Sequence, residues 1–309
     1  MEKGKITKMK KANVNLDIIN LASLSQRFPD EKSCRKYLEN IRWNGKIKCV
    51  HCKRSRKIYK INDGKLYKCA DCKKQFTVKI GTIFEDSSVP LQKWFFAIFI
   101  ITAHKKGISS LQLSKDIGVT QKTTWFMLHR IRYAVKTKSF NTPLENIVEA
   151  DETYIGGKHP GKRGRGSENK TPVFGMIERG GEVRATPVKR VDSKTLKKII
   201  KENISPEAII MTDEWRSYRG LSNHKVINHG KKEYARGDIH VNNIENFWSL
   251  LKRGIIGVYH NVSAEHLHRY CDEFSFRHNT RESVDSNRFD LLLGRCEGRL
   301  DYNTLINNN

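Results

Sequence analysis

Four cysteines in two closely spaced pairs constrain the fold of this chain more than any other feature of its sequence. Cys49 and Cys52 form one C-x2-C pair, and Cys69 and Cys72 form a second pair after sixteen intervening residues. In a chain of 309 residues without a secretory-signal layout, this spacing predicts four thiolate ligands rather than disulfides. Two knuckle turns can present four sulfur atoms tetrahedrally to Zn²⁺, which leaves no open coordination position. We therefore expect a structural zinc ion.

The segments between and after these pairs have the pattern of short strands. Residues 57–61 and 65–68 alternate in polarity, and Asn62-Asp63-Gly64 between them is a hairpin signal. Residues 75–78 form another short strand pattern. Together with the cysteines, these strands predict a zinc ribbon. Three further cysteines are expected to be buried thiols: Cys34, Cys271 and Cys296. His51, between the first two cysteines, is expected not to bind the metal.

Helical patterns follow the ribbon. Residues 91–103 are nearly all apolar, as expected of a buried helix. Further along, Ser109 or Ser110 can cap one helix, Gly118 can supply a turn, and Thr120 can cap a second helix. This layout predicts a helix-turn-helix, and an ordinary helical hairpin is the alternative. In a helix-turn-helix, the residues that contact DNA bases would lie at the start of the second helix: Gln121, Lys122 and Thr123.

The charge of the chain is strongly positive and uneven. It has 58 Lys and Arg against 33 Asp and Glu, a net charge of +25. Residues 1–148 hold 31 basic and 11 acidic residues, whereas residues 149–309 hold 27 and 22. A basic region joined to a nearly balanced one indicates a polyanion-binding part next to a catalytic part. The longest apolar run, residues 94–103, is too short to span a bilayer, so we expect a cytosolic, DNA-directed protein.

Three acidic residues in the second half are candidates for a metal-dependent active site. Asp151 and Asp213 each follow an apolar run of the β type, and Glu245 opens a helical pattern. Two carboxylates at strand ends and a third on a later helix can converge on a pair of divalent cations, which can catalyse an in-line phosphoryl displacement. Their nearest competitors are Glu152, Glu214 and Asp238. Because neighbouring residues on a strand face opposite sides, one acid of each adjacent pair should be a bystander.

The order of elements in this half predicts an α/β fold of the RNase H-like class. Strands are expected at 147–151, 172–178, 184–191 and 208–212, with an amphipathic helix at 192–202. Lys252 lies two helical turns after Glu245, where it could contact a substrate phosphate, with Asn243 and His240 as further neighbours. The glycine-rich segment 156–166 is not a P-loop. It is expected to be a basic DNA-contacting loop or a disordered hairpin, and its candidate contacts are Lys158, Lys162 and Arg163.

Several of these strings resemble a known family. Residues 149–158 (EADETYIGGK), 212–218 (TDEWRSY) and 240–254 (HVNNIENFWSLLKRG) are similar to blocks of bacterial insertion-sequence transposases of the DDE superfamily that carry an N-terminal zinc ribbon. Residues 259–263 and 273–279 match the closing segment of that family. The first knuckle, Cys-Val-His-Cys-Lys, departs from the more usual Cys-Pro-x-Cys-Gly but keeps its thiolates.

The resemblance implies a DNA transposase. It implies that Asp151, Asp213 and Glu245 bind two Mg²⁺ (or Mn²⁺), with Lys252 as the associated basic residue. The partners would be double-stranded DNA, both terminal inverted repeats and target, and at least one second copy of the chain. Two alternatives are a binding-only regulator with an inactive catalytic domain and a nuclease that does not join DNA. The expected parts are an N-terminal helical segment (1–44), the ribbon (45–86), a helix-turn-helix domain (87–140), an RNase H-like domain (145–285) and a C-terminal tail (286–309).

Overall fold

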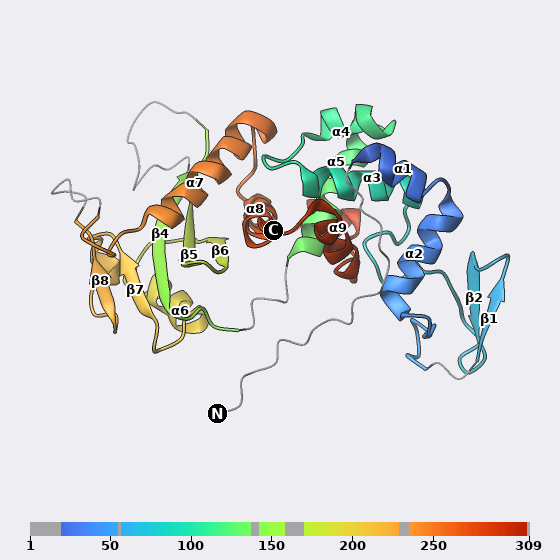
Figure 1. Cartoon of the computed structure of the whole chain (residues 1–309), viewed down its shortest axis with the longest axis horizontal. Coiled ribbons are helices and arrows are strands. Elements are labelled where there is room, and N and C mark those ends of the chain that lie inside the picture. The colour runs from blue at the N-terminus through green and yellow to red at the C-terminus, as the bar shows by residue number, and fades with distance from the viewer. Residues whose placement is uncertain (1–19, 55–56, 137–141, 158–169, 229–234, 308–309) are drawn as a thin grey trace. The chain divides into compact units, whose positions relative to one another are not determined.

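The computed structural model divides the chain into two compact units (Figure 1). One unit comprises Met1–Ala103 with Val284–Leu300, and the other comprises His104–Ser283 with Asp301–Asn309. The structure describes residues 20–54, 57–136, 142–157, 170–228 and 235–307. Over those residues, we find no helix with the length and apolar character that a membrane crossing requires. The two units are considered separately below.

The ribbon of the first unit is a three-stranded antiparallel sheet. Its strands are β1 (Ile58–Ile61), β2 (Leu66–Cys69) and β3 (Gln75–Phe76), in that order. The turn between β1 and β2 has positive φ angles at three consecutive residues, Asn62 (50°), Asp63 (53°) and Gly64 (76°). Asn, Asp and Gly tolerate this backbone region better than other residues do. The predicted hairpin is thus confirmed, and β3 is shorter than the expected 75–78.

Helices from both ends of the chain form the rest of this unit. They are α1 (Leu21–Arg27), α2 (Glu31–Trp43), α3 (Leu91–Ala103) and α9 (Asp285–Gly294). The buried ring of Phe289 in α9 lies 5.5 Å from Phe95 and 6.2 Å from Phe28, measured between ring centroids. The part of the chain expected to be a tail therefore contains a helix of this aromatic core. Helix α3 belongs to this unit as well, and not with the two helices that follow it, as the expected domain 87–140 would have it.

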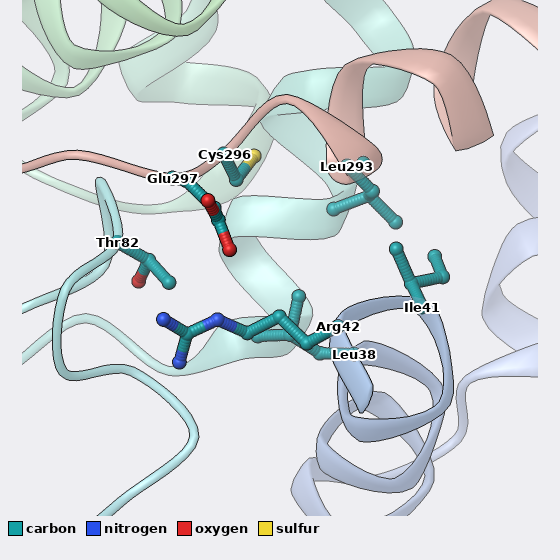
Figure 2. A pocket seen from close by; sticks show the side chains of 8 residues that line it. Leu38, Ile41, Arg42, Thr82, Leu293, Cys296 and Glu297 are labelled. Atoms are coloured by element: carbon teal, nitrogen blue, oxygen red, sulfur yellow. The ribbon is translucent and has the colours of Figure 1, made fainter. Parts of the chain in front are cut away.

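A small cavity of about 80 Å³ lies in the first unit (Figure 2). Arg42 from α2 and Glu297, which follows α9, project into it, and Thr82 and Cys296 line it as well. Sites for drug-sized ligands have volumes of roughly 300–1,000 Å³. This cavity is too small for such a ligand, and it is a packing space within the first unit.

The second unit begins with two helices that are joined by a short turn. Helix α4 (Ser110–Ile117) begins at Ser109, whose side chain accepts a hydrogen bond from the Gln112 N–H at 3.1 Å. It ends at Gly118, which has a φ of 60°, and α5 (Gln121–Val135) starts after Thr120, whose hydroxyl caps it. The caps and the turn predicted from the sequence are therefore confirmed.

The core of the second unit is a mixed five-stranded sheet with the order β6-β5-β4-β7-β8. Strands β4, β5 and β6 are antiparallel neighbours, whereas β7 and β8 run parallel to β4. Three antiparallel strands, a crossover helix and then parallel strands confirm the expected RNase H-like class. The bounds are β4 (Ile147–Ile155), β5 (Thr171–Glu178), β6 (Val183–Pro187), β7 (Ile209–Thr212) and β8 (His224–Val226).

Two of these strands differ from the expectation. The third strand ends at Pro187 rather than at residue 191, and the short strand β8 was not anticipated. Proline has no N–H to donate to a strand ladder, which agrees with the end of β6 at that residue. Strand β8 has three residues of mixed polarity, His-Lys-Val, a pattern too short to indicate a strand by alternation.

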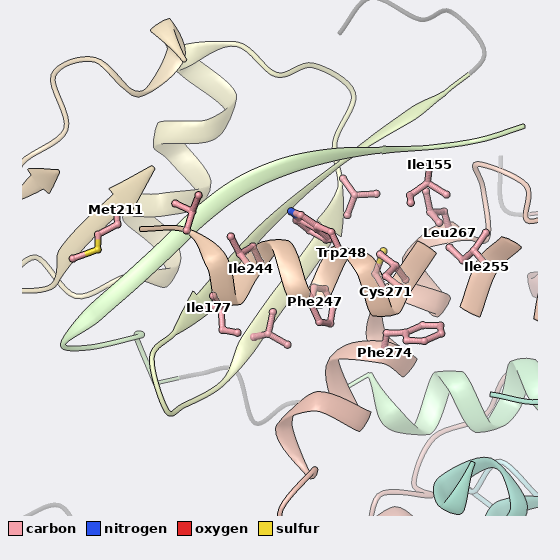
Figure 3. Close-up of a cluster of buried hydrophobic side chains, with 14 of the residues drawn as sticks. Ile155, Ile177, Met211, Ile244, Phe247, Trp248, Ile255, Leu267, Cys271 and Phe274 are labelled. Atoms are coloured by element: carbon pink, nitrogen blue, oxygen red, sulfur yellow. The ribbon is translucent and has the colours of Figure 1, made fainter. Parts of the chain in front are cut away.

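Helices cover both faces of this sheet. On one face, Leu196 and Ile200 of α6 (Ser193–Asn203) pack with Ala150 and Phe174. On the other face, Ile244, Phe247, Trp248 and Leu251 of α7 (Asn242–Gly254) pack with strand residues and with α8 (Leu267–Asn279) (Figure 3). Shorter helical segments are a 3₁₀ turn (Arg216–Tyr218), a π-helical turn after α7 (Ile255–Tyr259) and α10 (Tyr302–Ile306).

A buried ionic cluster fastens α5 to α8. The carboxylate of Glu273 accepts hydrogen bonds from Arg132 Nε, Arg277 Nη2 and the Tyr259 hydroxyl, each at 2.6 Å. Burial alone would raise the pKa of Glu273, but the two guanidinium groups outweigh it and lower that pKa to about 2. The carboxylate is therefore ionised in the folded protein at all but strongly acidic pH.

We expect Glu273→Ala to lower the free energy of unfolding by about 3–5 kcal/mol, because it leaves two buried guanidinium groups without their shared anion. In the wild-type protein this contribution is present above pH about 4.5 and is lost as the pH falls toward 2. Urea unfolding at pH 7 measures the effect. The control is Glu282→Ala, which removes an exposed partner of Arg281 and should cost less than about 1 kcal/mol. Equal losses in the two variants would contradict the prediction.

Candidate active site and metal centre

The four ribbon cysteines form a compact thiol cluster. Their Sγ atoms all lie within 4.8 Å of one another, with 3.6 Å between Cys49 and Cys72 and 3.7 Å between Cys52 and Cys69. A tetrahedral zinc site with Zn–S bonds of about 2.3 Å has sulfur–sulfur edges of about 3.8 Å. The cluster therefore fits a structural zinc ion. The ring of His51 bonds through Nε2 to the Gln75 carbonyl oxygen at 3.1 Å, as a bystander would.

Asp151 lies on β4, and Asp213 directly follows β7, the parallel strand next to it. The register pairs Glu149 of β4 with Met211 of β7, so two residues further on Asp151 is level with Asp213. Asp213 follows β7 directly, as predicted. Asp151 does not end its strand but occupies the fifth of the nine positions of β4, because β5 pairs with β4 as far as Ile155. The first acid therefore projects from the middle of a strand.

The surroundings of Asp151 combine burial, negative charge and one specific donor. Burial, together with the charges of Glu152 and Asp213, raises the pKa of Asp151 to about 7. The indole Nε1–H of Trp248 donates a hydrogen bond to Asp151 Oδ2 at 3.0 Å. Gly175 lies opposite Asp151 on β5, and a Cβ atom there would come within 2.4 Å of the Trp248 ring. The absence of a side chain at Gly175 therefore makes room for the indole that holds Asp151.

Glu152 faces the other side of the sheet. Its carboxylate accepts a hydrogen bond of 2.6 Å from the buried Tyr218 hydroxyl, within the layer that contains α6. This placement agrees with the alternation that made one of the adjacent acids a bystander. Glu214 is exposed, and the backbone carbonyl of Asp238 accepts a hydrogen bond from Arg179.

Glu245 and Lys252 lie on α7, the helix that carries Trp248. Glu245 is exposed, one turn before Trp248. Lys252 is half-buried, and burial lowers its pKa while the charge of Asp151 acts in the opposite direction. Lys252 is therefore close enough to Asp151 for their charges to interact.

The three acids are gathered less tightly than the cysteines. Among the residues that the structure describes, only the four cysteines form a group of three or more potential ligands with all donor atoms within 4.8 Å. A pair of ions about 3.5–4 Å apart spreads its ligands more widely than one ion does. The carboxylates are hard oxygen donors suited to Mg²⁺ or Mn²⁺. The donor set therefore fits divalent ions.

The raised pKa of Asp151 leads to a prediction about stability. A folded-state pKa above the ordinary 3.8 means that ionisation of this carboxyl costs stability as the pH rises toward 7. Without added divalent metal, Asp151→Asn should therefore raise the free energy of unfolding at pH 8 by up to about 4 kcal/mol, and by less than half of that at pH 5. Urea unfolding of the zinc-loaded protein at both pH values measures this. An Asp151→Asn protein no more stable than wild type at pH 8 would show that the carboxylate is compensated.

The residues predicted to contact DNA are only partly within the described structure. Gln121 and Lys122 are exposed and Thr123 is partly buried, all in the first turn of α5. Gln121 donates a hydrogen bond to Ser110 Oγ at 2.8 Å, and the Lys122 ammonium lies 5.6 Å from the centre of the Tyr302 ring. The three loop candidates lie outside the described residues: Lys158, Lys162 and Arg163.

Three residues of the site were not expected from the sequence to have a role: Glu149, Arg179 and Trp248. Strand alternation could have identified Glu149, since it lies two residues before Asp151 and shares its face. Helical spacing could have identified Trp248, which follows Glu245 by three residues. No local pattern pointed to Arg179. It reaches Glu149 from the turn after β5, a contact that only the folded sheet creates.

Comparisons with known proteins agree with these observations. Residues 143–279 match the family described as ISXO2-like transposase domain, and residues 29–75 match a transposase zinc-ribbon domain. An uncharacterized protein in transposable element ISH50 of Halobacterium salinarum is 30% identical over 274 residues, which cover 81% of this chain and 91% of that protein. An uncharacterized transposase-like protein of Haemophilus influenzae is 34% identical over 105 residues, 33% of this chain and 84% of that protein.

Among solved structures, a pre-cleavage Mos1 transpososome is 15% identical and covers 62% of this chain and 75% of its own, with a TM-score of 0.26. A likeness this low does not bear on the site. The sequence matches do, because they span both the ribbon and the sheet that carries the acids. The chain belongs to the insertion-sequence transposases that combine an N-terminal zinc ribbon with an ISXO2-like transposase domain.

Proposed function

We propose that this chain is a DNA transposase that binds the terminal inverted repeats of an insertion sequence and catalyses metal-dependent cleavage and strand transfer. The observation that carries the proposal is the placement of Asp151 on β4 beside Asp213, which directly follows the parallel strand β7, together with Glu245 on the helix that packs on this face. Family membership supports the same activity. Water would attack first to free a 3′-hydroxyl, which would then attack target DNA.

Each residue of the site has a defined task in this proposal. Asp151, Asp213 and Glu245 would hold two Mg²⁺ (or Mn²⁺). When bound, these ions would activate the attacking oxygen and stabilise the leaving oxygen. The indole N–H of Trp248 orients Oδ2 of Asp151. Lys252 would contact the phosphate whose ester bond is exchanged.

Recognition of DNA would depend on the ribbon and on α4 and α5, acting as a helix-turn-helix. The first turn of α5 (Gln121, Lys122 and Thr123) would meet base edges. Lys158, Lys162 and Arg163 would contact the DNA backbone. The excess of basic residues before residue 149 supplies the electrostatic attraction. Two element ends must be paired, so the active form would be at least a dimer on DNA.

A strand-transfer assay tests the proposal. Oligonucleotides that carry the inverted repeats flanking the reading frame are incubated with the zinc-loaded protein, Mg²⁺ and a supercoiled plasmid. Products that join oligonucleotide 3′ ends to the plasmid are expected. Cleavage without joining would instead identify a nuclease, and binding without cleavage would identify a regulator with an inactive catalytic domain.

A further inference from the structure

Glu149 is a buried carboxylate on β4, two residues before Asp151. Its side chain is 0% exposed, and it lies on the same face of β4 as Asp151. It accepts hydrogen bonds from Arg179 Nε (2.7 Å), from the Asn243 N–H (2.8 Å) and side-chain amide (2.7 Å), and from the Ile244 N–H (3.2 Å). These contacts join β4 to the first turn of α7.

Glu149 thereby caps α7 from a strand 94 residues away in sequence. The first N–H groups of a helix have no partner within the helix and need acceptors from elsewhere. The N-cap residue of α7 is Val241, whose side chain has no acceptor atom. A carboxylate at this end also interacts favourably with the helix dipole. These hydrogen bonds hold the first turn of α7, which contains Glu245, against β4.

Arg179 connects the Glu149 carboxylate to β7, the strand that precedes Asp213. Its Nη1 donates to the Asp238 carbonyl oxygen at 2.7 Å, and its Nη2 lies 3.1 Å from both the His240 carbonyl oxygen and the Met211 Sδ atom. Met211 pairs with Glu149 in the sheet and lies two residues before Asp213. One guanidinium group thus contacts β4, β7 and the segment that leads into α7.

We infer that the Glu149–Arg179 pair is the positioning unit of the acidic site. It fixes β4, β7 and α7 in the register that brings Asp151, Asp213 and Glu245 to one level. A buried ion pair is often no more stabilising than apolar residues of similar volume, because both charges lose their hydration. Here the guanidinium of Arg179 instead links three parts of the unit: Nε contacts β4, Nη2 contacts β7, and Nη1 and Nη2 contact the segment that leads into α7. The inference rests on the proposed function.

The experiment compares Arg179→Met with Arg184→Met in full-length, zinc-loaded protein. Arg184 is a matched control: it lies on the same hairpin, is buried, and donates to Asn203 and to the Thr142 carbonyl oxygen, away from the acids. Two quantities are measured, Mn²⁺ binding by electron paramagnetic resonance and hydrogen exchange of the peptide covering residues 241–247.

We expect Arg179→Met and Glu149→Ala to weaken Mn²⁺ binding by about 10- to 100-fold, the usual effect of losing an outer-shell partner. Exchange of the first turn of α7 should accelerate at least about tenfold in Glu149→Ala, where two helix N–H groups lose their acceptor. Glu149→Gln keeps a carbonyl oxygen and should restore part of the protection. Arg184→Met should change Mn²⁺ binding less than about twofold.

Folded variants with wild-type Mn²⁺ binding and wild-type exchange would overturn the inference. If Arg179→Met does not fold, Arg179→Lys replaces it, because lysine keeps the charge but cannot reach all four acceptors at once. Wild-type protein that binds no Mn²⁺ would contradict the proposed active site instead. In that case the exchange of residues 241–247 still tests the capping role of Glu149.

Discussion

Asp151→Asn should reduce Mg²⁺-dependent cleavage of terminal-repeat DNA by at least about a thousandfold. The substitution removes the charge that would bind the ions but keeps the shape of the side chain and an oxygen that can accept from Trp248. A loss of about 4 kcal/mol of transition-state stabilisation, within the range that metal ions provide, corresponds to this factor. Initial rates with a labelled oligonucleotide measure it, and DNA binding measured by gel shift should be retained.

Glu152→Gln is the matched control for Asp151→Asn. The two residues are adjacent on β4, but Glu152 faces α6 and accepts a hydrogen bond from Tyr218. A glutamine carbonyl oxygen can accept that bond, so cleavage should stay within about tenfold of wild type. Similar losses in both variants would show that burial of charge in this strand, rather than the position of Asp151, controls the reaction.

Cys69→Ser should release the zinc ion and unfold the ribbon. Structural zinc sites supply about 10–16 kcal/mol of apparent binding free energy in small peptides, more than a three-stranded sheet of this size could replace. Atomic absorption should find about one zinc per wild-type chain and far less in the variant. Limited proteolysis should then cut within residues 45–86.

Cys34→Ser serves as the control for this loss. Cys34 is buried in α2 of the same unit but lies outside the thiol cluster. The zinc content of this variant should remain at the wild-type level. A wild-type zinc content in Cys69→Ser would refute the four-thiolate site.

The features predicted correctly from the sequence are those written into short stretches of chain. The ribbon follows from cysteine spacing and one turn, and the ends of α4 and α5 follow from Ser109, Gly118 and Thr120. Each of these residues affects the backbone only within a few positions of its own place in the sequence. Local chemistry therefore fixes the elements without information about the rest of the fold.

The errors arose where a distant segment decides the outcome. An apolar run ends at Asp151, but β4 continues because β5, some twenty residues later, supplies hydrogen bonds as far as Ile155. Strand alternation places Glu149 on the face of Asp151, but its partners on α7 lie 94 residues away. Pairing of this kind is encoded by the whole sheet, so single-sequence patterns cannot reveal it.

The expected tail shows the same limitation. Phe289 packs with Phe95 of α3, 194 residues earlier, and neither local pattern identifies the other as its partner. The apolar character of α3 correctly predicted burial. It did not predict which helix would cover it.

This return of α9 to the first unit has a consequence for biosynthesis. The aromatic core around α3 cannot close until Val284–Leu300 has left the ribosome, after the entire sheet has been translated. A nascent chain that ends before residue 284 therefore lacks the ring of Phe289 against Phe95, and only the N-terminal partners of α3, such as Phe28, pack there. Completion of the first unit is thus coupled to synthesis of a segment that follows the whole sheet.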